Sequence, residues 1–165
     1  MKRLFIAIFA MLVVAGVQAQ VVSTKEHYSI GNIGLMNVIT IKVAIEKYND
    51  DVHKFCIFEH TTSKGNTIGL KITSDELEIL LQKMDEIKVG NMNLNCDYFE
   101  KEYTIVKDVN HILAVGFYIK TKLDANKGQQ WYLKIDDGIL DVMVFPSFND
   151  VYHVLGKARA KLQTL

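Results

Sequence analysis

The sequence has no excess of charge of either sign, only one proline and only two cysteines, and these shortages exclude several classes of protein. Among 165 residues there are 19 Lys and Arg and 19 Asp and Glu. The chain therefore lacks the basic surplus with which dedicated nucleic-acid-binding proteins neutralise phosphates. A single proline excludes a proline-rich stalk, and 49% hydrophobic residues argue against disorder. A chain of this length buries about two-thirds of its extended surface, so it can fold without metal or disulfide support.

Catalytic and metal-binding motifs are also missing from the sequence. The five histidines are scattered, and none has the spacing of a zinc-hydrolase helix. The segment Asp124–Gly128 begins like a calcium loop but lacks the glycine and the distal glutamate that such a loop needs, so we interpret it as a hairpin turn. Ser147 is placed to cap a helix and has no base beside it in the sequence. We therefore expect no metal, no cofactor and no catalytic residue, which favours a non-enzymatic protein.

Residues 1–19 have the pattern of an export signal. Two basic residues precede a thirteen-residue apolar run, Leu4–Gly16, and small or moderate residues follow it up to Ala19. A helix of that length spans only about 20 Å, which is less than the roughly 30 Å hydrocarbon core of a bilayer. We predict a signal peptide cleaved between Ala19 and Gln20, and a periplasmic or secreted protein. The mature chain then has no transmembrane segment, and its 17 basic and 19 acidic residues make it slightly acidic.

The two cysteines permit two interpretations. Cys56 lies in an apolar stretch and Cys96 in a polar one. In an oxidising compartment they can form one disulfide, or they can remain separate thiols. A zinc site would need further ligands at short spacings, and the sequence does not provide them.

The apolar pattern of the mature chain repeats with an offset of 74 residues. Alternating apolar residues predict one strand with a single buried face in each half. The buried face of the first strand consists of Ile39, Ile41, Val43 and Ile45, and that of the second consists of Leu113, Val115, Phe117 and Ile119. A second strand follows at an offset of 76, with Phe55 and Ile57 expected on the core face together with their counterparts Trp131 and Leu133. The third pair of strands aligns Ile68, Leu70 and Ile72 with Val142, Val144 and Pro146. Because the length changes fall in turns, the pattern indicates a duplicated unit.

Each third strand leads into a predicted helix. The segments Thr73–Glu76 and Ser147–Asp150 both place a hydroxyl at the start of a helix and an acid three residues later. The first helix is expected to stop near Gly90, and a less distinct strand precedes each set, at residues 26–30 and 98–107. We therefore predict an α+β fold in which residues 20–165 form one compact domain. It consists of two pseudo-symmetric ββββα units with antiparallel sheets, at about 26–90 and 98–165.

This duplicated four-strand-plus-helix unit resembles the Whirly and positive-cofactor-type single-stranded-DNA-binding architecture, in which paired C-terminal helices hold two sheets together. The resemblance covers residues 26–165 and rests on the order of the elements, because the chain has no Lys-Gly-Lys-rich strand like that of Whirly proteins. It implies nucleic-acid binding as an alternative function and transfers no site residue. A signal peptide before a small, motif-poor α+β body also resembles the small uncharacterised exported proteins of Gram-negative bacteria.

The strand faces opposite the core form the predicted binding surface. Alternation places Phe58, Tyr118, Lys120 and Tyr132 there, and aromatic rings beside lysine are suited to stacking on sugars or bases. Our hypothesis is an exported, non-catalytic binding or interaction module for a protein, glycan or small ligand of the cell envelope. One alternative is a single-stranded nucleic-acid-binding protein, which the acidic mature charge disfavours. The other is an enzyme without a recognisable motif.

Overall fold

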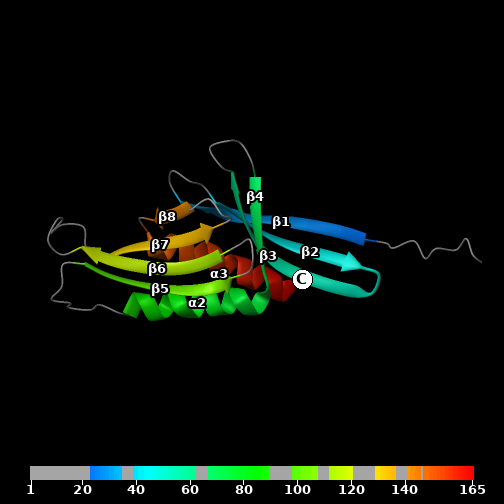
Figure 1. The fold of residues 1–165 in the computed structure, drawn as a ribbon. Coiled ribbons are helices and arrows are strands. Elements are labelled where there is room, and N and C mark those ends of the chain that lie inside the picture. Colours follow the sequence, from blue (N-terminus) through cyan, green and yellow to red (C-terminus); the bar gives the residue numbers. More distant parts are fainter. Residues whose placement is uncertain are drawn as a thin grey trace, which may run out of the picture.

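The computed structural model describes residues 23–34, 39–61, 67–89, 98–107, 112–120, 129–136, 141–145 and 147–165. These residues form an α+β structure with two antiparallel four-stranded sheets and two helices (Figure 1). The first sheet has the order β1 (Ser23–Ile33), β2 (Ile39–Tyr48), β3 (Asp51–Thr61) and β4 (Thr67–Ile72), and α2 (Ser74–Val89) follows it. The second sheet has the order β5 (Tyr98–Lys107), β6 (Ile112–Lys120), β7 (Gln129–Asp136) and β8 (Asp141–Phe145), and α3 (Phe148–Thr164) follows it.

The predicted signal peptide and its cleavage site lie outside the described residues, which begin at Ser23. None of the helices in the described part of the chain combines the length and the apolar character that crossing a membrane requires.

The alternation predicted for the two strands β2 and β6 is confirmed. Ile41 and Val43 of β2 and Leu113 and Val115 of β6 have no exposed surface, and all four side chains belong to one core cluster. Each of these strands pairs with a neighbour on both sides, and its apolar face is covered by a helix: α3 contacts β2, and α2 contacts β6. The core is continuous between the two sheets, because the same cluster contains residues of both.

The predicted facing of β3 is wrong by one residue. Its core residues are Cys56 and Phe58, whereas Phe55 and Ile57 were expected there. In the observed register Val43 pairs with Cys56, and paired residues share a face, so Cys56 joins Val43 in the core. The sequence Phe-Cys-Ile-Phe is apolar at every position, and alternation therefore could not decide which face is buried.

The same shift corrects the alignment between the two sheets. Val43 pairs with Cys56 in the first sheet and Phe117 pairs with Trp131 in the second, so β3 and β7 correspond at an offset of 75 instead of 76. By the same registers Leu70 aligns with Met143, at an offset of 73, whereas the predicted alignment paired Leu70 with Val144.

Both predicted helix starts are confirmed. The backbone N–H of Thr73 donates to Oε2 of Glu76 at 2.7 Å, and the N–H of Glu76 donates to Oγ1 of Thr73 at 3.3 Å, which completes a capping box. At the second helix, the N–H of Asp150 donates to Oγ of Ser147 at 3.3 Å. Each helix buries one stripe: Leu77, Leu80, Leu81, Met84 and Ile87 in α2, and Phe148, Val151, Leu155, Ala158 and Leu162 in α3.

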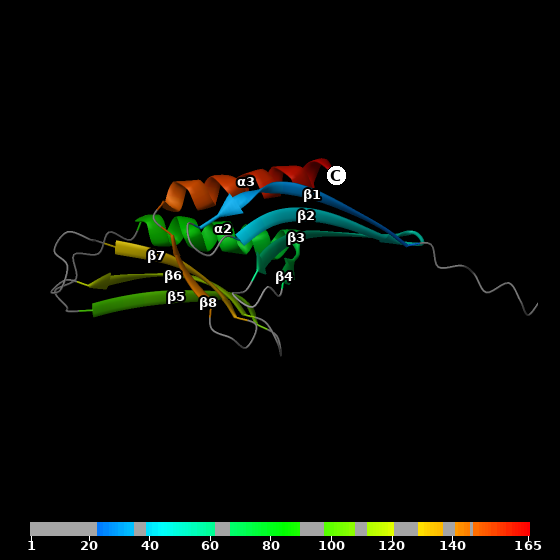
Figure 2. The same cartoon turned by 90° about the horizontal axis from the view of Figure 1, so that it is seen from above.

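Each helix packs mainly against the sheet of the other half of the chain. Helix α2 follows the first sheet and contacts its strand β3, but it packs more extensively on β5 and β6, while α3 follows the second sheet and contacts β1, β2 and β3 (Figure 2). The helices also contact each other: the hydroxyl of Tyr152 donates to Oδ2 of Asp85 at 2.8 Å, and Arg159 lies 3.4 Å from Glu78. Because the helices cover the inner faces, the opposite face of each sheet is the surface on which to look for a site.

Candidate functional site

The outer face of the second sheet gathers tyrosines and carboxylates from three adjacent strands. Strand β5 contributes Tyr98, Glu100 and Glu102, and β6 and β7 contribute Gly116, Tyr118, Gln130, Tyr132 and Lys134. Register explains the grouping: Glu102 pairs with Gly116 and Gly116 with Tyr132, while Glu100 pairs with Tyr118 and Tyr118 with Gln130. Directly paired residues lie on the same side of a sheet. We call these eight residues the tyrosine–glutamate face.

Tyr132 lies across Gly116 and reaches the carboxylates of β5. A Cβ atom on Gly116 would stand 2.5 Å from both Cζ and the hydroxyl oxygen of Tyr132, so the close approach of the ring requires glycine. The hydroxyl lies 2.7 Å from Oε1 of Glu100 and 3.0 Å from Oε2 of Glu102, and it donates its single proton to these two acceptors. Tyr132 is 2% exposed, and burial, together with the hydrogen bonds to the two carboxylates, raises its pKa.

Tyr98 and Tyr118 extend this arrangement to the edge of the sheet. The ring of Tyr98 stacks on that of Tyr118 with centroids 6.3 Å apart, and Tyr118 meets Tyr132 at 6.4 Å. Tyr98 is 51% exposed and donates its hydroxyl proton to Glu100, a bond that raises the pKa of Tyr98 to about 12 and lowers that of Glu100. The hydroxyl of Tyr118 donates to Oε1 of Gln130. A row of three tyrosine rings thus crosses β5, β6 and β7.

The structure brings together two of the four residues that the sequence predicted for binding. Tyr118 and Tyr132 lie on the outer face as expected. Phe58 does not: it is 1% exposed and part of the core, because β3 faces the opposite way from the prediction. Lys120 ends β6 and pairs with Tyr98 in register, while its side chain lies outside the described part of the structure.

Sequence reasoning missed the β5 residues of this face. Tyr98, Glu100 and Glu102 alternate with Phe99 and Lys101, and this period-2 pattern is the signal that would have placed all three on one side.

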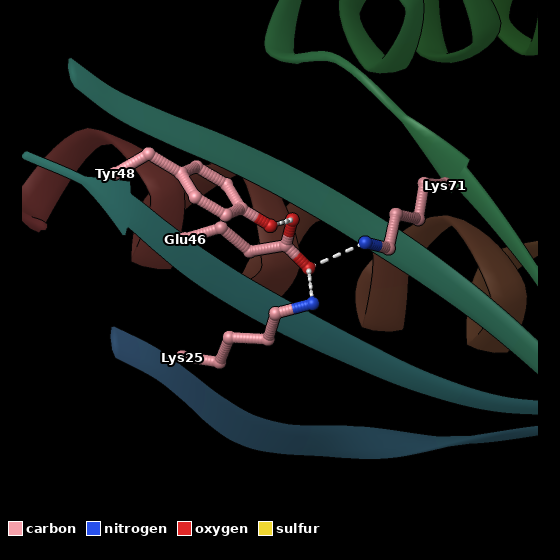
Figure 3. Close-up of polar contacts among 4 residues, drawn as sticks. All are labelled: Lys25, Glu46, Tyr48 and Lys71. Atoms are coloured by element: carbon pink, nitrogen blue, oxygen red, sulfur yellow. Dashed lines mark hydrogen bonds and ion pairs between the residues drawn. The ribbon is translucent and has the colours of Figure 1, made fainter. Parts of the chain in front are cut away.

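The outer face of the first sheet carries a charged cluster around Glu46. Figure 3 shows the Glu46 carboxylate between Lys25 and Lys71, with the hydroxyl of Tyr48 on its other oxygen. Oε1 accepts a hydrogen bond from the Lys71 ammonium and lies 3.6 Å from Nζ of Lys25, and Tyr48 donates to Oε2 at 3.2 Å. Glu46 is 6% exposed, and the Lys71 hydrogen bond holds its pKa below the usual range.

The charges of this cluster are satisfied within the sheet. The ammonium of Lys71 also lies 5.2 Å from the ring centroid of Phe55, and nearby Lys42 donates to both oxygens of Glu59 at 2.7 and 2.9 Å. Such pairs join β1, β2, β3 and β4 laterally. We therefore interpret the Glu46 cluster as a structural element.

The described cysteine is not arranged for chemistry. Cys56 is a free thiol without exposed surface, and burial raises its pKa to about 12, which keeps it protonated at neutral pH. Cys96 lies outside the described residues. No group of three His, Cys, Asp or Glu within the described ranges is placed to hold a metal ion.

The tyrosine–glutamate face therefore has features of a binding surface: the exposed ring of Tyr98, the partly exposed ring of Tyr118 beside it, and acceptor groups held by the buried Tyr132. No known protein family matches the sequence, and no curated protein was found to be similar to it.

Proposed function

We propose that this chain is an exported, non-catalytic binding module and that its ligand, a component of the cell envelope, docks on the tyrosine–glutamate face. The observation that carries the proposal is the row of Tyr98, Tyr118 and Tyr132, whose outermost ring is 51% exposed on an otherwise well-paired sheet. Exposed aromatic rings on a rigid support offer contact area at a small cost in conformational entropy. The hydrogen bonds from Tyr132 to Glu100 and Glu102 hold the row in place before a ligand arrives.

The test compares two variants of the purified protein. Tyr98→Ala together with Tyr118→Ala removes the open part of the row, and Val52→Ser removes another exposed apolar side chain, 52% exposed on the first sheet, as a matched control. Immobilised wild-type and variant proteins are exposed to separate envelope fractions of protein, glycan and small molecules. We expect a fraction that binds wild type and Val52→Ser and is lost from the tyrosine variant. Equal retention by all three proteins would remove this face from consideration.

Export of the chain is part of the same proposal and has its own test. The basic start, the apolar run Leu4–Gly16 and the small residue Ala19 support a cleavable signal. Expression of the whole sequence in a Gram-negative host should yield a periplasmic or secreted protein whose first residue, by mass spectrometry, is Gln20. A protein that keeps Met1 and stays in the cytoplasm would contradict export.

We further propose that the two halves are copies of one ββββα unit related by a half-turn. Three observations support this proposal: the order of elements, the exchange of helices between sheets, and an irregularity at a similar place in each first strand, between Ser29 and Gly31 and between Thr104 and Val106. An experimental structure in which the β1–α2 and β5–α3 segments cannot be superposed by a rotation near 180° would contradict it.

The tyrosine row also favours one competing function, single-stranded nucleic-acid binding, because bases stack on aromatic rings. Glu100 and Glu102 oppose it, since both carboxylates are hydrogen-bonded to Tyr132 of the row and would repel phosphates close to it. A labelled oligonucleotide titrated at low salt separates the two functions. Absence of affinity at low salt, where phosphate contacts are strongest, would exclude the nucleic-acid function.

A further inference from the structure

We propose that the tyrosine–glutamate face binds an extended basic segment of a partner protein, with its lysine or arginine side chains against Tyr98, Glu100 and Glu102. This inference rests on the proposed function, because it names the ligand class for the same surface.

The tyrosines and carboxylates of this face offer a ligand more hydrogen-bond acceptors than donors. The hydroxyl protons of Tyr98 and Tyr132 are donated to the two carboxylates, and that of Tyr118 is donated to Gln130. A tyrosine hydroxyl has one proton, and an ionised carboxylate has about four acceptor positions and no donor. What these groups still offer a ligand is therefore mostly acceptor capacity, together with the electron-rich faces of the rings. A ligand that fits must bring donors and positive charge.

The protein makes a comparable contact with itself. On β1, the edge strand of the first sheet, the hydroxyl of Tyr28 donates to Oε2 of Glu26 at 2.6 Å. The ammonium of Lys161, from α3, lies 4.2 Å from the ring centroid of that tyrosine. A tyrosine bonded to a glutamate two residues away thus holds a lysine over its ring, as expected for a cation–π contact.

The second sheet has a comparable tyrosine–glutamate pair on its own edge strand, on the outer instead of the inner face and in the reverse chain order, and leaves it accessible. Tyr98 donates to Glu100, two residues away on β5, and the Tyr98 ring is half-exposed. Strand β5 is one of the two edge strands of its sheet (Figure 1). A cation from a partner can therefore approach Tyr98 as Lys161 approaches Tyr28.

The spacing of the two carboxylates favours an extended peptide over a small amine. Glu100 and Glu102 alternate on one strand, so their backbone positions are about 7 Å apart. Alternate residues of an extended peptide have the same separation, so a segment with basic residues at every second position can meet both carboxylates at once. A single amine would reach one carboxylate and one ring, on a surface three strands wide.

The proposal predicts effects of opposite sign for the two kinds of charge on this face. Glu102 has an internal competitor, because Nζ of Lys134 lies 3.9 Å from its Oε1. Neutralising the carboxylates should weaken binding of a basic peptide, and neutralising Lys134 should strengthen it. A neutral ligand recognised by stacking would show neither effect.

The test uses fluorescence anisotropy with a labelled synthetic peptide of four lysines alternating with serines, and with an all-serine peptide of equal length. Glu100→Gln with Glu102→Gln removes the two charges while keeping oxygen acceptors for Tyr132. Its matched control is Glu78→Gln with Glu86→Gln, which removes two exposed carboxylates from α2. Lys134→Gln is compared with Lys157→Gln, an exposed lysine on α3.

We expect the lysine peptide to bind wild type, the glutamate variant to bind it about tenfold more weakly, and Lys134→Gln to bind it about threefold more tightly. Both control variants should stay within twofold of wild type, and the all-serine peptide should not bind. Failure of wild type to bind the lysine peptide, or equal losses in the α2 control, would overturn the inference. If Tyr98→Ala with Tyr118→Ala still abolishes binding of an envelope fraction, the proposed function stands and only the basic ligand class is wrong.

Discussion

Replacing Gly116 by alanine is expected to destabilise the protein by about 2–4 kcal/mol, because the new methyl group occupies the space of the Tyr132 ring end. The added Cβ would lie 2.5 Å from two atoms of Tyr132 and 2.8 Å from the backbone oxygen of Lys101. The ring end cannot move away freely, since its hydroxyl is bonded to Glu100 and Glu102. Displacing it loses a hydrogen bond to a charged group, about 1.5–3 kcal/mol, and the remaining overlap with backbone costs about 1 kcal/mol or more.

Urea unfolding measures this effect, and Gly156→Ala provides a control with the opposite sign. Gly156 lies inside α3, and nothing stands within 4 Å of a Cβ built on it, so alanine there should stabilise the protein by about 1 kcal/mol. The two variants make the same chemical change at an obstructed and an open position. If Gly116→Ala unfolds at the wild-type urea concentration with an unchanged slope, Tyr132 does not lie across β6 and the reasoning about this face fails.

Three further predictions concern the core and the first sheet. In a Cys96→Ser protein, Cys56 should not react with a thiol reagent until the protein unfolds, because burial raises its pKa to about 12 and keeps the thiol protonated. Reaction within seconds in native buffer would contradict the burial of Cys56. Glu46→Gln should lower the free energy of unfolding at pH 7 by roughly 1 kcal/mol. The pKa of Glu46 is lower in the folded than in the unfolded protein, so this stabilisation is complete above the unfolded pKa of about 4.3 and is lost as pH falls through the folded pKa. The free energies of unfolding of wild type and variant, measured by urea titration, should therefore converge in acid. Thr73→Ala should cost about 1 kcal/mol in thermal unfolding by removing the side-chain half of the α2 cap, and an unchanged midpoint would show that the cap contributes nothing.

The parts of the fold that could be predicted are those in which the sequence alternates between apolar and polar residues. The strand around Ile41 has a large apolar residue at every second position, so its core face was evident, and the hydroxyl-to-acid spacing of Thr73 and Glu76 marked a helix start. In β3 the apolar run around Cys56 satisfies either facing. Only the pairing of Val43 with Cys56, a contact between two strands, decides which side of β3 is buried.

The candidate site was only partly predictable for a similar reason. Tyr118 and Tyr132 could be assigned to one face by alternation within their own strands. The hydrogen bond between Tyr132 and Glu100 depends on the register of three strands and on the space left by Gly116. The sequence of a single strand predicts neither the register nor this space. Phe58 was misplaced because the error in the facing of β3 extended to all of its residues.

The exchange of helices between the two halves has a consequence for how the polypeptide acquires its structure. The helix that covers the first sheet, α3, is synthesised after every strand of the second sheet. Until α3 has emerged, α2 reaches the first sheet mainly at β3, and β1 and β2 lack the helix that packs against them, so the first sheet cannot reach its final state before the last element of the chain is synthesised. A polypeptide that must stay unfolded to pass through a translocation channel would benefit from this built-in delay.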